Sequence, residues 1–459
     1  MSKEEMSNSV PNRALPPGPR IPRLILGAML LTNSGAAAGW LKRRYGDAFT
    51  LDMPVFGRGV VVSSPELVKQ MFTAKPDVLV FGQSSPLGDV LGPGSLFSLD
   101  GKRHLDERRL LLPPFHGERM KSYEAIIEEE ARREMAAWQD GVEFATLPSF
   151  MRITLNSILR AVFGARGPHQ RRLAELLPGL VSLASRLTLL PSAQRDLGRL
   201  SPGGLFARRR RTYDELIDTM IDECLADPAL EDRVDVMALL LRAHYEDGSS
   251  MSRSAIADEL LTLLAAGHET TATSLAWAVE RLTRHPSTLL RLQSEARSGG
   301  AELRAATINE IQRVRPVITG TGRQVAADEF QLGEWRVPRG YRVFASATLI
   351  HNDERFFERP LEFDPDRFLG RKPDTYTWIP FGGGTRRCIG AAFAQMEMDV
   401  VLRTMLCEFE LQPTAKRGER WHNRGVAFAP ARGGRAALTR IVTEPPQPAA
   451  VGDGALAAA

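Results

Sequence analysis

The chain of 459 residues is poor in cysteine, with only Cys224, Cys388 and Cys407. Three cysteines are too few, and odd in number, for the disulfide framework of a small secreted protein, so the sequence favours a reducing compartment. We therefore predict a cytoplasmic protein. Because cysteine is so rare, a cysteine set in an unusual local sequence is a candidate for chemistry rather than for cross-linking.

The sequence also lacks a large net charge and a long apolar run. Its formal net charge is +4, which gives no support for nucleic-acid binding. No apolar stretch approaches the roughly 20 residues that span a bilayer. The best candidate, RLILGAMLL at residues 23–31, is too short. We predict no transmembrane anchor and interpret 23–31 as an amphipathic or buried first helix, with weak contact to a membrane surface as the minor alternative.

Most of the chain has the spacing of apolar residues that is typical of helices. The longest such segment, 254–284, opens with Ser254 as a plausible cap and closes just before His285 and Pro286, as a helix terminus should. We predict a long central helix that crosses the molecule.

Two stretches have the alternation of β-strands instead. Residues 48–63 predict a hairpin that turns near 57–59, and residues 330–350 predict strands with turns at Gly333 and at 338–340. The sequence therefore predicts a mainly α protein with a smaller β-rich part.

The segment PFGGGTRRCIG, at residues 380–390, surrounds Cys388 with glycine and arginine. A thiolate that ligates a metal needs backbone N–H donors around it, and glycines let the main chain approach closely and adopt positive φ. Gly382, Gly383, Gly384 and Gly390 would provide that freedom. The alternative is a buried structural cysteine in a glycine loop, which is what a lone cysteine usually is.

The spacing within this loop is specific. Phe381, Gly384, Arg386, Cys388 and Gly390 spell F-x-x-G-x-R-x-C-x-G, which resembles the haem-binding signature of the cytochrome P450 superfamily. Such a match should occur by chance in a chain of this length only about once in ten thousand. The chain resembles soluble actinobacterial, especially mycobacterial, members over most of its length.

The resemblance implies a cofactor and a fold. The cofactor would be haem b, with Cys388 as the axial ligand, Phe381, Gly382 and Gly390 around the haem, and Arg386 bonded to a propionate. The fold would have a large helical lobe with a long central helix over the haem, and a smaller β-rich lobe.

Within the predicted central helix, residues 266–271 read AGHETT and resemble the superfamily pattern [AG]-G-x-[DE]-T-[ST]. A threonine hydroxyl in a helix can bond the carbonyl four residues back, which for Thr270 belongs to Ala266. Gly267 would remove side-chain bulk and leave a groove for dioxygen. The resemblance implies catalytic roles for Thr270, as a hydrogen-bond donor to dioxygen, and for Glu269, in proton delivery. The alternative is an ordinary helix interior that tolerates threonine.

Glu310 and Arg313 match the E-x-x-R pattern of the superfamily and share one helix face. The pattern alone carries little weight, because Glu129 with Arg132 also spells it. Position in the chain distinguishes the two. The segment FDPDRF, which contains Arg367, lies between Glu310 and Cys388, where relatives carry P-x-R-F. We predict a structural ion network of Glu310, Arg313 and Arg367.

Further cations would hold the haem propionates. His104 and Arg108 lie four residues apart in GKRHLDERRLLLPPF, which resembles a propionate-contacting helix of the superfamily. Arg323 matches an arginine that precedes the second β stretch in relatives. The alternative for each is ordinary surface charge.

Charged residues near the predicted haem site indicate the electron donor, and apolar stretches indicate the substrate. Lys102, Arg103, Arg109 and Arg387 would form a basic patch for an acidic electron donor, and we expect a ferredoxin with its reductase. Residues 78–99 carry one charge, Asp89, which favours a lipophilic small molecule such as a fatty acid, a sterol-like or a polycyclic compound. The other expected substrate-contacting stretches are 163–211, the face near Leu263 and Ala266, 317–321 and 426–428.

The motifs run from His104 to Gly390 and would meet around one cofactor, so we predict a single domain at 16–444, with flexible segments at 1–15 and 445–459, and a monomer. The predicted activity is insertion of one oxygen atom from O₂ into a lipophilic substrate. The alternatives are a peroxide-driven or oxygen-independent haem enzyme, and a non-catalytic haem sensor or lipid-binding protein. The presence of both Glu269 and Thr270 counts against them.

Overall fold

The computed structural model of the chain describes residues 14–441, apart from residue 33 and the segments 54–56, 83–84, 118 and 165–166. Of the two segments predicted to be flexible, residues 1–13 and all of 445–459 lie outside this description.

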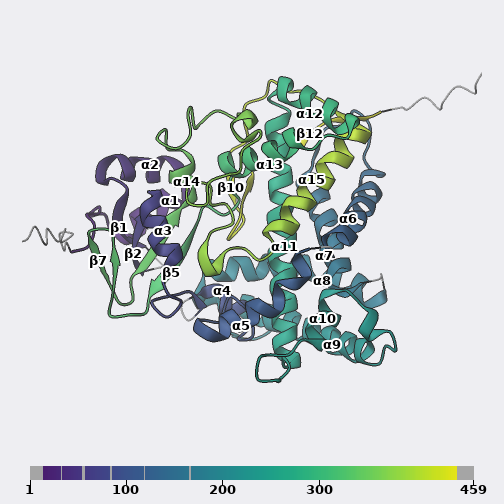
Figure 1. Ribbon diagram of the computed structural model, residues 1–459, viewed down its shortest axis with the longest axis horizontal. Coiled ribbons are helices and arrows are strands. Elements are labelled where there is room, and N and C mark those ends of the chain that lie inside the picture. Colours follow the sequence, from purple (N-terminus) through teal and green to yellow (C-terminus); the bar gives the residue numbers. More distant parts are fainter. Residues whose placement is uncertain are drawn as a thin grey trace, which may run out of the picture.

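The long central helix, α11, spans Arg253–Leu282 and runs the height of the helical lobe (Figure 1). The hydroxyl of Ser252, not of Ser254 as predicted, caps it by accepting a hydrogen bond of 3.2 Å from the backbone N–H of Ala255. Apolar residues occur on every side of α11, which is typical of a helix buried all round.

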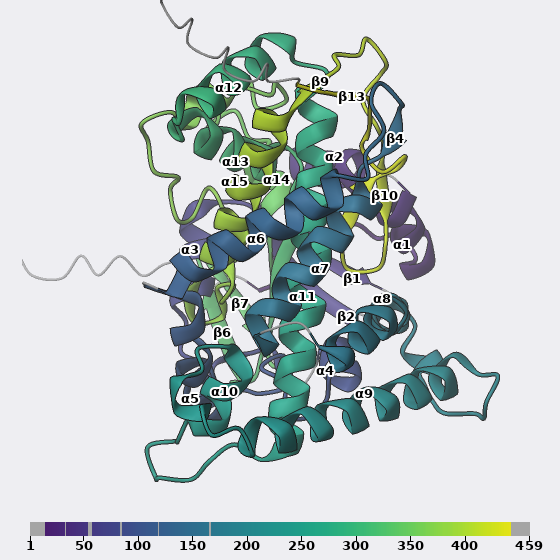
Figure 2. The same cartoon turned by 90° about the vertical axis from the view of Figure 1, so that its right-hand side faces the viewer.

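Other helices enclose α11 and form the main apolar core with it. Helix α7 packs along α11, and Figure 2 shows α6 crossing near α15. The helices of this lobe are α4 (Pro86–Leu91), α5 (Gly101–Leu111), α6 (Arg119–Met135), α7 (Leu147–Phe163), α8 (Pro168–Leu189), α9 (Pro202–Leu225), α10 (Val236–Arg242), α12 (Pro286–Ser298), α13 (Glu302–Val314) and α15 (Ala391–Glu408).

The β-rich lobe lies to the left in Figure 1 and holds a five-stranded sheet of order β1-β2-β8-β5-β3. In this sheet only β2 and β8 pair in parallel. The strands and helices of this lobe are α1 (Arg23–Thr32), α2 (Ser34–Tyr45), β1 (Ala48–Met53), β2 (Gly57–Val62), α3 (Pro65–Thr73), β3 (Leu79–Val80), β5 (Gly320–Val325), β6 (Glu329–Leu332), β7 (Trp335–Pro338), β8 (Arg342–Ser346) and α14 (Ala347–His351).

Both predicted β stretches are present, with two corrections. Residues 57–59 belong to β2 and pair with β1, so they do not form the predicted turn. Residues 347–350 begin the short helix α14, because the hydroxyl of Ser346 caps that helix at the backbone N–H of Leu349. The mainly α fold with a smaller β-rich lobe is as predicted.

Short pairs of strands and single 3₁₀ turns complete the chain. The pairs are β4 (Phe144–Ala145) with β12 (Arg435–Ala436), β9 (Phe409–Leu411) with β13 (Leu438–Arg440), and β10 (Trp421–Asn423) with β11 (Phe428–Pro430). The 3₁₀ turns are η2 (Pro113–Phe115), η3 (Pro191–Gln194), η4 (Leu230–Asp232), η5 (Pro365–Phe368) and η6 (Gly384–Arg386).

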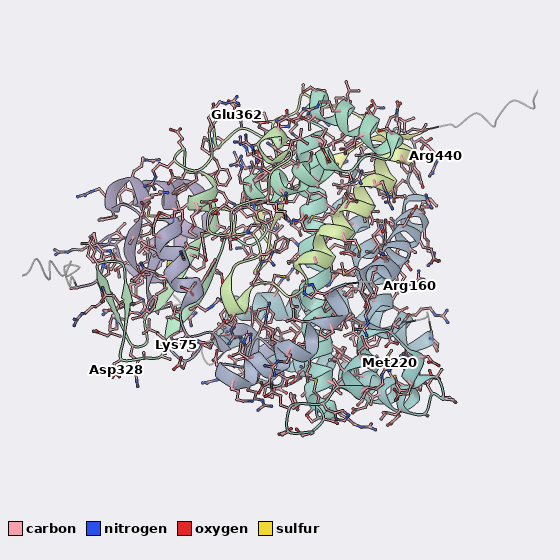
Figure 3. All side chains as sticks on the ribbon, in the orientation of Figure 1. Lys75, Arg160, Met220, Asp328, Glu362 and Arg440 are labelled. Atoms are coloured by element: carbon pink, nitrogen blue, oxygen red, sulfur yellow. The ribbon has the colours of Figure 1, made fainter. Side chains whose placement is uncertain are left out.

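Helix α1 is partly buried, since Leu26 is buried whereas the apolar side chains of Leu24 and Ile25 are exposed. Within the described ranges, no helix is both long and apolar enough to cross a membrane. Charged side chains such as Asp328 and Glu362 lie at the periphery of the molecule (Figure 3).

Candidate active site

The loop that carries Cys388 leads into α15 and is closed by a hydrogen bond of 2.9 Å from the backbone N–H of Cys388 to the carbonyl of Phe381. Gly382 and Gly384 have φ of +63° and +64°, which glycine adopts without strain. At Gly383, an added Cβ would lie 2.0 Å from the ring of Phe72. These three glycines therefore have the conformational or steric need that the sequence predicts.

Gly390 differs from the other three. Its φ is −87°, and an added Cβ would meet no atom within 4 Å, so nothing in the protein requires glycine there. The predicted need for backbone freedom is wrong at this position. Its backbone N–H instead donates a hydrogen bond to the side chain of Cys388.

Cys388 is exposed and borders an open cavity. Protein atoms close to its thiol raise the pKa of Cys388 by desolvation, while the hydrogen bond from Gly390 and the positive charges of Arg108 and Arg387 oppose that rise. The same cysteine lines a cavity of about 300 Å³ together with Arg108, Phe381 and Ile389. The environment therefore contains the backbone donor and the cations that a thiolate ligand needs.

One face of α11 is open although the rest of that helix is buried. Between residues 255 and 280, only residues 265–267 and Thr270 are not buried, and Ala266 is exposed. The Thr270 hydroxyl donates to the Ala266 carbonyl at 2.8 Å, the bond that the sequence predicts. Since Ala266 and Thr270 lie one turn apart, they share the exposed face of α11.

Gly267 does not leave the predicted groove on this face of α11. A Cβ at this position would contact the side chain of Ile158 on α7 at 3.4 Å. The Cβ that this position lacks would therefore point at α7, where it would make an ordinary contact with Ile158. His268 is also directed away from the open face, since it is buried and its Nδ1 lies 2.7 Å from the Leu264 carbonyl.

The cations predicted to hold propionates lie together. The pKa of His104 is lowered to about 3, first by burial and then by the positive charges of Arg386 and Arg108. Burial lowers the pKa of Arg323 to about 9, with a further contribution from Arg386. These groups come from α5, β5 and the cysteine loop, three elements far apart in sequence.

A carboxylate that the sequence reasoning missed lies among these cations. Nη2 of Arg386 donates to Asp100 Oδ1 and to the Leu99 carbonyl, each at 2.5 Å. Asp100 also accepts from the backbone N–H groups of Phe81 and Gly82. Arg386 is thus already bonded to the segment before α5, so any bond to a propionate would have to coexist with this pair.

The charges of this cluster fit a haem. Arg108, Arg323, Arg386 and Asp100 all act on the pKa of His104, and together these three cations and one carboxylate carry an excess of two positive charges. Two propionates would neutralise that excess, and burial of the arginines makes such neutralisation favourable. The cysteine with its backbone donor and the cation excess are together suited to the group that the sequence implies.

Glu310, Arg313 and Arg367 meet as one buried network. Two nitrogens of Arg313 donate to the two carboxylate oxygens of Glu310, both at 2.7 Å, and both side chains are fully buried. Nε of Arg367 donates to Glu310 at 3.1 Å. The look-alike residue Glu129 instead forms exposed ion pairs on the surface.

Glu269 is buried and has a partner that sequence reasoning did not identify. Nε of Arg424, in the hairpin between β10 and β11, donates to Oε1 of Glu269 at 3.1 Å. No local pattern marks this pair, because 155 residues separate its members.

The predicted basic patch is exposed but partly neutralised. Lys102 pairs with Asp106, and Arg109 pairs with Glu246. Arg103 and Arg387 are also exposed.

Comparisons with known proteins agree with this arrangement. Residues 16–433 match the family described as Cytochrome P450. The chain is 54% identical over 427 residues to cytochrome P450 138 of Mycobacterium tuberculosis, covering 93% of this chain and 96% of that protein. It is 38% identical over 457 residues to cytochrome P450 135B1 of the same organism, covering 97% of this chain and 96% of that protein.

Solved structures show the same fold. The retinoic acid-bound cyanobacterial CYP120A1 superposes with a TM-score of 0.81 at 22% identity, over 93% of this chain and 100% of that one. The cytochrome P450DA heme domain superposes with a TM-score of 0.80 at 22% identity, over 94% of this chain and 99% of that one.

Proposed function

Because the chain belongs to the cytochrome P450 family and is therefore a haem-thiolate monooxygenase, we propose that it oxidises a lipophilic small molecule with electrons from a ferredoxin and its reductase. The reaction consumes the substrate, O₂, two electrons and two protons, and yields the oxygenated product and water. The haem supplies the reductive activation of dioxygen when it is bound.

The protein residues would hold that group and manage protons. Cys388 would be the axial ligand, and Arg108, Arg323 and Arg386 would neutralise the propionates. The open face of α11 at Ala266 and Thr270 is the single observation that best supports oxygen-dependent chemistry. It offers a hydroxyl on the exposed face of an otherwise buried helix, with Glu269 next to it in the chain to supply protons.

An apolar substrate is supported by side chains of the stretches predicted to contact it. Asp89, the one charged residue of 78–99, is exposed to solvent, whereas Leu87, Leu96 and Phe97 are half-buried and pack against the core. Ile318 likewise packs against the core beside the buried Val317. Apolar walls with few polar groups favour a lipophilic ligand such as a fatty acid, a sterol-like or a polycyclic compound.

The substrate class is tested by titration of the ferric holoenzyme with palmitic acid, cholesterol and a polycyclic natural product, followed by the Soret difference spectrum. We expect a saturable shift with at least one lipophilic compound and none with a polar amino acid of similar size. Equal responses to polar and apolar compounds would contradict the proposal.

The electron donor is tested through the exposed cations of the basic patch. Arg103 in α5 and Arg387 in the cysteine loop are exposed cations, so an acidic ferredoxin would be attracted to this surface. We expect Arg103→Glu and Arg387→Glu to slow reduction by ferredoxin and to weaken its dependence on salt. Arg339→Glu, in a remote turn of the β-rich lobe where Arg339 pairs with Asp328, is the control. Equal rates for all variants would refute this docking site.

The domain, location and assembly are proposals of the same kind. We propose a single catalytic domain at 16–444 that acts as a cytoplasmic monomer, supported by the three free cysteines. Light scattering of the holoenzyme at several concentrations tests the monomer.

A further inference from the structure

We infer that Arg424 is a positioning residue for Glu269, and that it couples this carboxylate to helix α8 through the tip of the β10–β11 hairpin. The inference rests on the proposed role of Glu269 in proton delivery. It adds a residue, a connection and a consequence that the motif around Glu269 does not contain.

The ion pair places Arg424 directly on the carboxylate. Nε of Arg424 lies 3.1 Å from Oε1 of Glu269, whose side chain is only 10% exposed. Within the part of the chain that the structure describes, Glu269 has no other ion-pair partner. A nearly buried carboxylate with one cation keeps the direction that this cation imposes, because the charge-assisted bond is its strongest interaction.

The backbone around Arg424 is itself fixed. The N–H of Arg424 donates to the carbonyl of Ala427 at 2.9 Å, and the N–H of Gly425 donates to Oδ1 of Asn423 at 2.7 Å. Gly425 has a φ of +114°, a conformation that favours glycine. The tip therefore presents Arg424 from a closed turn and not from a loose loop.

Ser185 of α8 clamps this tip. Its hydroxyl donates to the Arg424 carbonyl at 3.3 Å and accepts from the N–H of Val426 at 3.2 Å. A Cβ on Gly425 would lie 2.1 Å from the same hydroxyl, so only glycine permits this approach. Figure 2 shows the yellow hairpin extending from β10 towards α8.

The other end of the hairpin is fixed to α11. Nε1 of Trp277 donates to the carbonyl of Phe428 at 2.9 Å, and the N–H of Phe428 donates to the Val317 carbonyl at 3.0 Å. The hairpin base thus moves with α11, which carries Glu269, whereas its tip is bound to α8. A displacement of α8 relative to α11 therefore acts on the bond between Arg424 and Glu269.

The consequence concerns how reduced oxygen leaves the enzyme. With two electrons and two protons, O₂ leaves as hydrogen peroxide, and with four of each it leaves as two waters. A carboxylate held in place for proton delivery favours cleavage of the O–O bond over release of peroxide. Loss of Arg424 is expected to raise the share of peroxide.

The first test is hydrogen–deuterium exchange of the ferric holoenzyme, which needs neither substrate nor turnover. We expect faster exchange at residues 424–427 in Arg424→Gln and Ser185→Ala than in the wild type. Arg424→Lys is expected to restore part of the protection. Arg420→Gln, an exposed arginine before the same hairpin, is the matched control and should match the wild type.

The second test measures oxygen and hydrogen peroxide during NADPH-driven turnover with a plant-type ferredoxin and its reductase, without added substrate. We expect Arg424→Gln to raise the peroxide formed per oxygen consumed by about twofold or more, and Arg424→Lys to raise it less. The double variant Glu269→Gln with Arg424→Gln should form no more peroxide per oxygen consumed than Glu269→Gln alone, because the arginine acts through the carboxylate.

The two tests separate the inference from the proposed function. Exchange at 424–427 and peroxide yield that are both unchanged in Arg424→Gln would overturn the inference. A wild-type holoenzyme that consumes no oxygen would contradict the proposed ferredoxin-driven reaction, and the exchange data would still decide whether Arg424 orders the tip.

Discussion

Nε2 of His351 accepts a hydrogen bond of 3.1 Å from the backbone N–H of Ile379, nine residues before Cys388. Because Nε2 accepts, Nδ1 must carry the proton, and it donates to the carbonyl of Arg313 at 3.1 Å. The neutral imidazole thus joins the buried ion network on α13 to the segment that leads into the cysteine loop.

This geometry predicts sensitivity to acid. Burial, and then the charge of Arg313, lowers the pKa of His351 from 6.5 to about 3. Because the folded pKa lies below the unfolded one, the stability that this histidine contributes is complete above about pH 6.5 and is lost as the pH falls towards 3. The loss should reach about 2 to 3 kcal/mol by about pH 4.5.

Denaturant unfolding of the wild type and of His351→Gln between pH 7 and 4.5 tests this. The variant is expected to lose less stability over that interval, although it is less stable at pH 7. Exposed His422→Gln is the control. Parallel pH profiles for all three proteins would contradict the assignment.

Removal of Glu310 should release the haem. Glu310→Ala leaves the fully buried Arg313 without its carboxylate, which costs about 3 to 5 kcal/mol. Glu129→Ala removes a surface carboxylate from the look-alike pattern and should cost under about 1 kcal/mol. The haem-to-protein absorbance ratio checks both variants. A Glu310→Ala protein that is soluble and retains full haem would refute the network's role.

Arg323 should destabilise the haem-free protein and stabilise the haem-bound protein. Its buried cation, with a pKa lowered to about 9, is costly until an anion neutralises it. Arg323→Gln should therefore raise the melting temperature of the haem-free protein and speed transfer of haem to apomyoglobin by about tenfold, the effect of losing one ionic contact. A variant whose haem-free form melts lower, with unchanged haem transfer, would show that Arg323 acts only on the fold.

The glycines of the cysteine loop should differ in their tolerance of alanine. Gly384 has positive φ, and a Cβ there would lie 2.1 Å from the Phe72 carbonyl oxygen, so Gly384→Ala should cost at least about 1 to 3 kcal/mol. Gly390→Ala meets no protein atom and should leave the unfolding free energy of the haem-free protein unchanged. Equal losses of stability would mean that the loop geometry described above is incorrect.

Sequence reasoning succeeded where chemistry is local. The bond from Thr270 to Ala266 follows from the period of a helix, and the need for glycine at 382–384 follows from a main chain that must approach closely and adopt positive φ around the cysteine. The pairing of Glu310 with Arg313 likewise needs only a shared helix face.

The remainder depends on contacts between distant segments. Nothing near Glu269 indicates that Arg424 pairs with it, and nothing near Arg386 indicates that Asp100 occupies its guanidinium. The sequence does not tell in which direction the missing side chain of Gly267 would point. Only the packing of Ile158 shows that it would point at α7 and not into an oxygen groove.

Ligation of the haem iron by Cys388 is tested by the spectrum of the reduced carbon monoxide complex of the wild type, Cys388→His and Cys407→Ser. We predict that the wild type and Cys407→Ser share the red-shifted Soret band of a thiolate-ligated haem, and that Cys388→His moves this band to the position of an imidazole-ligated haem. A Cys388→His protein that keeps the thiolate band would contradict the assignment of Cys388 as the iron ligand.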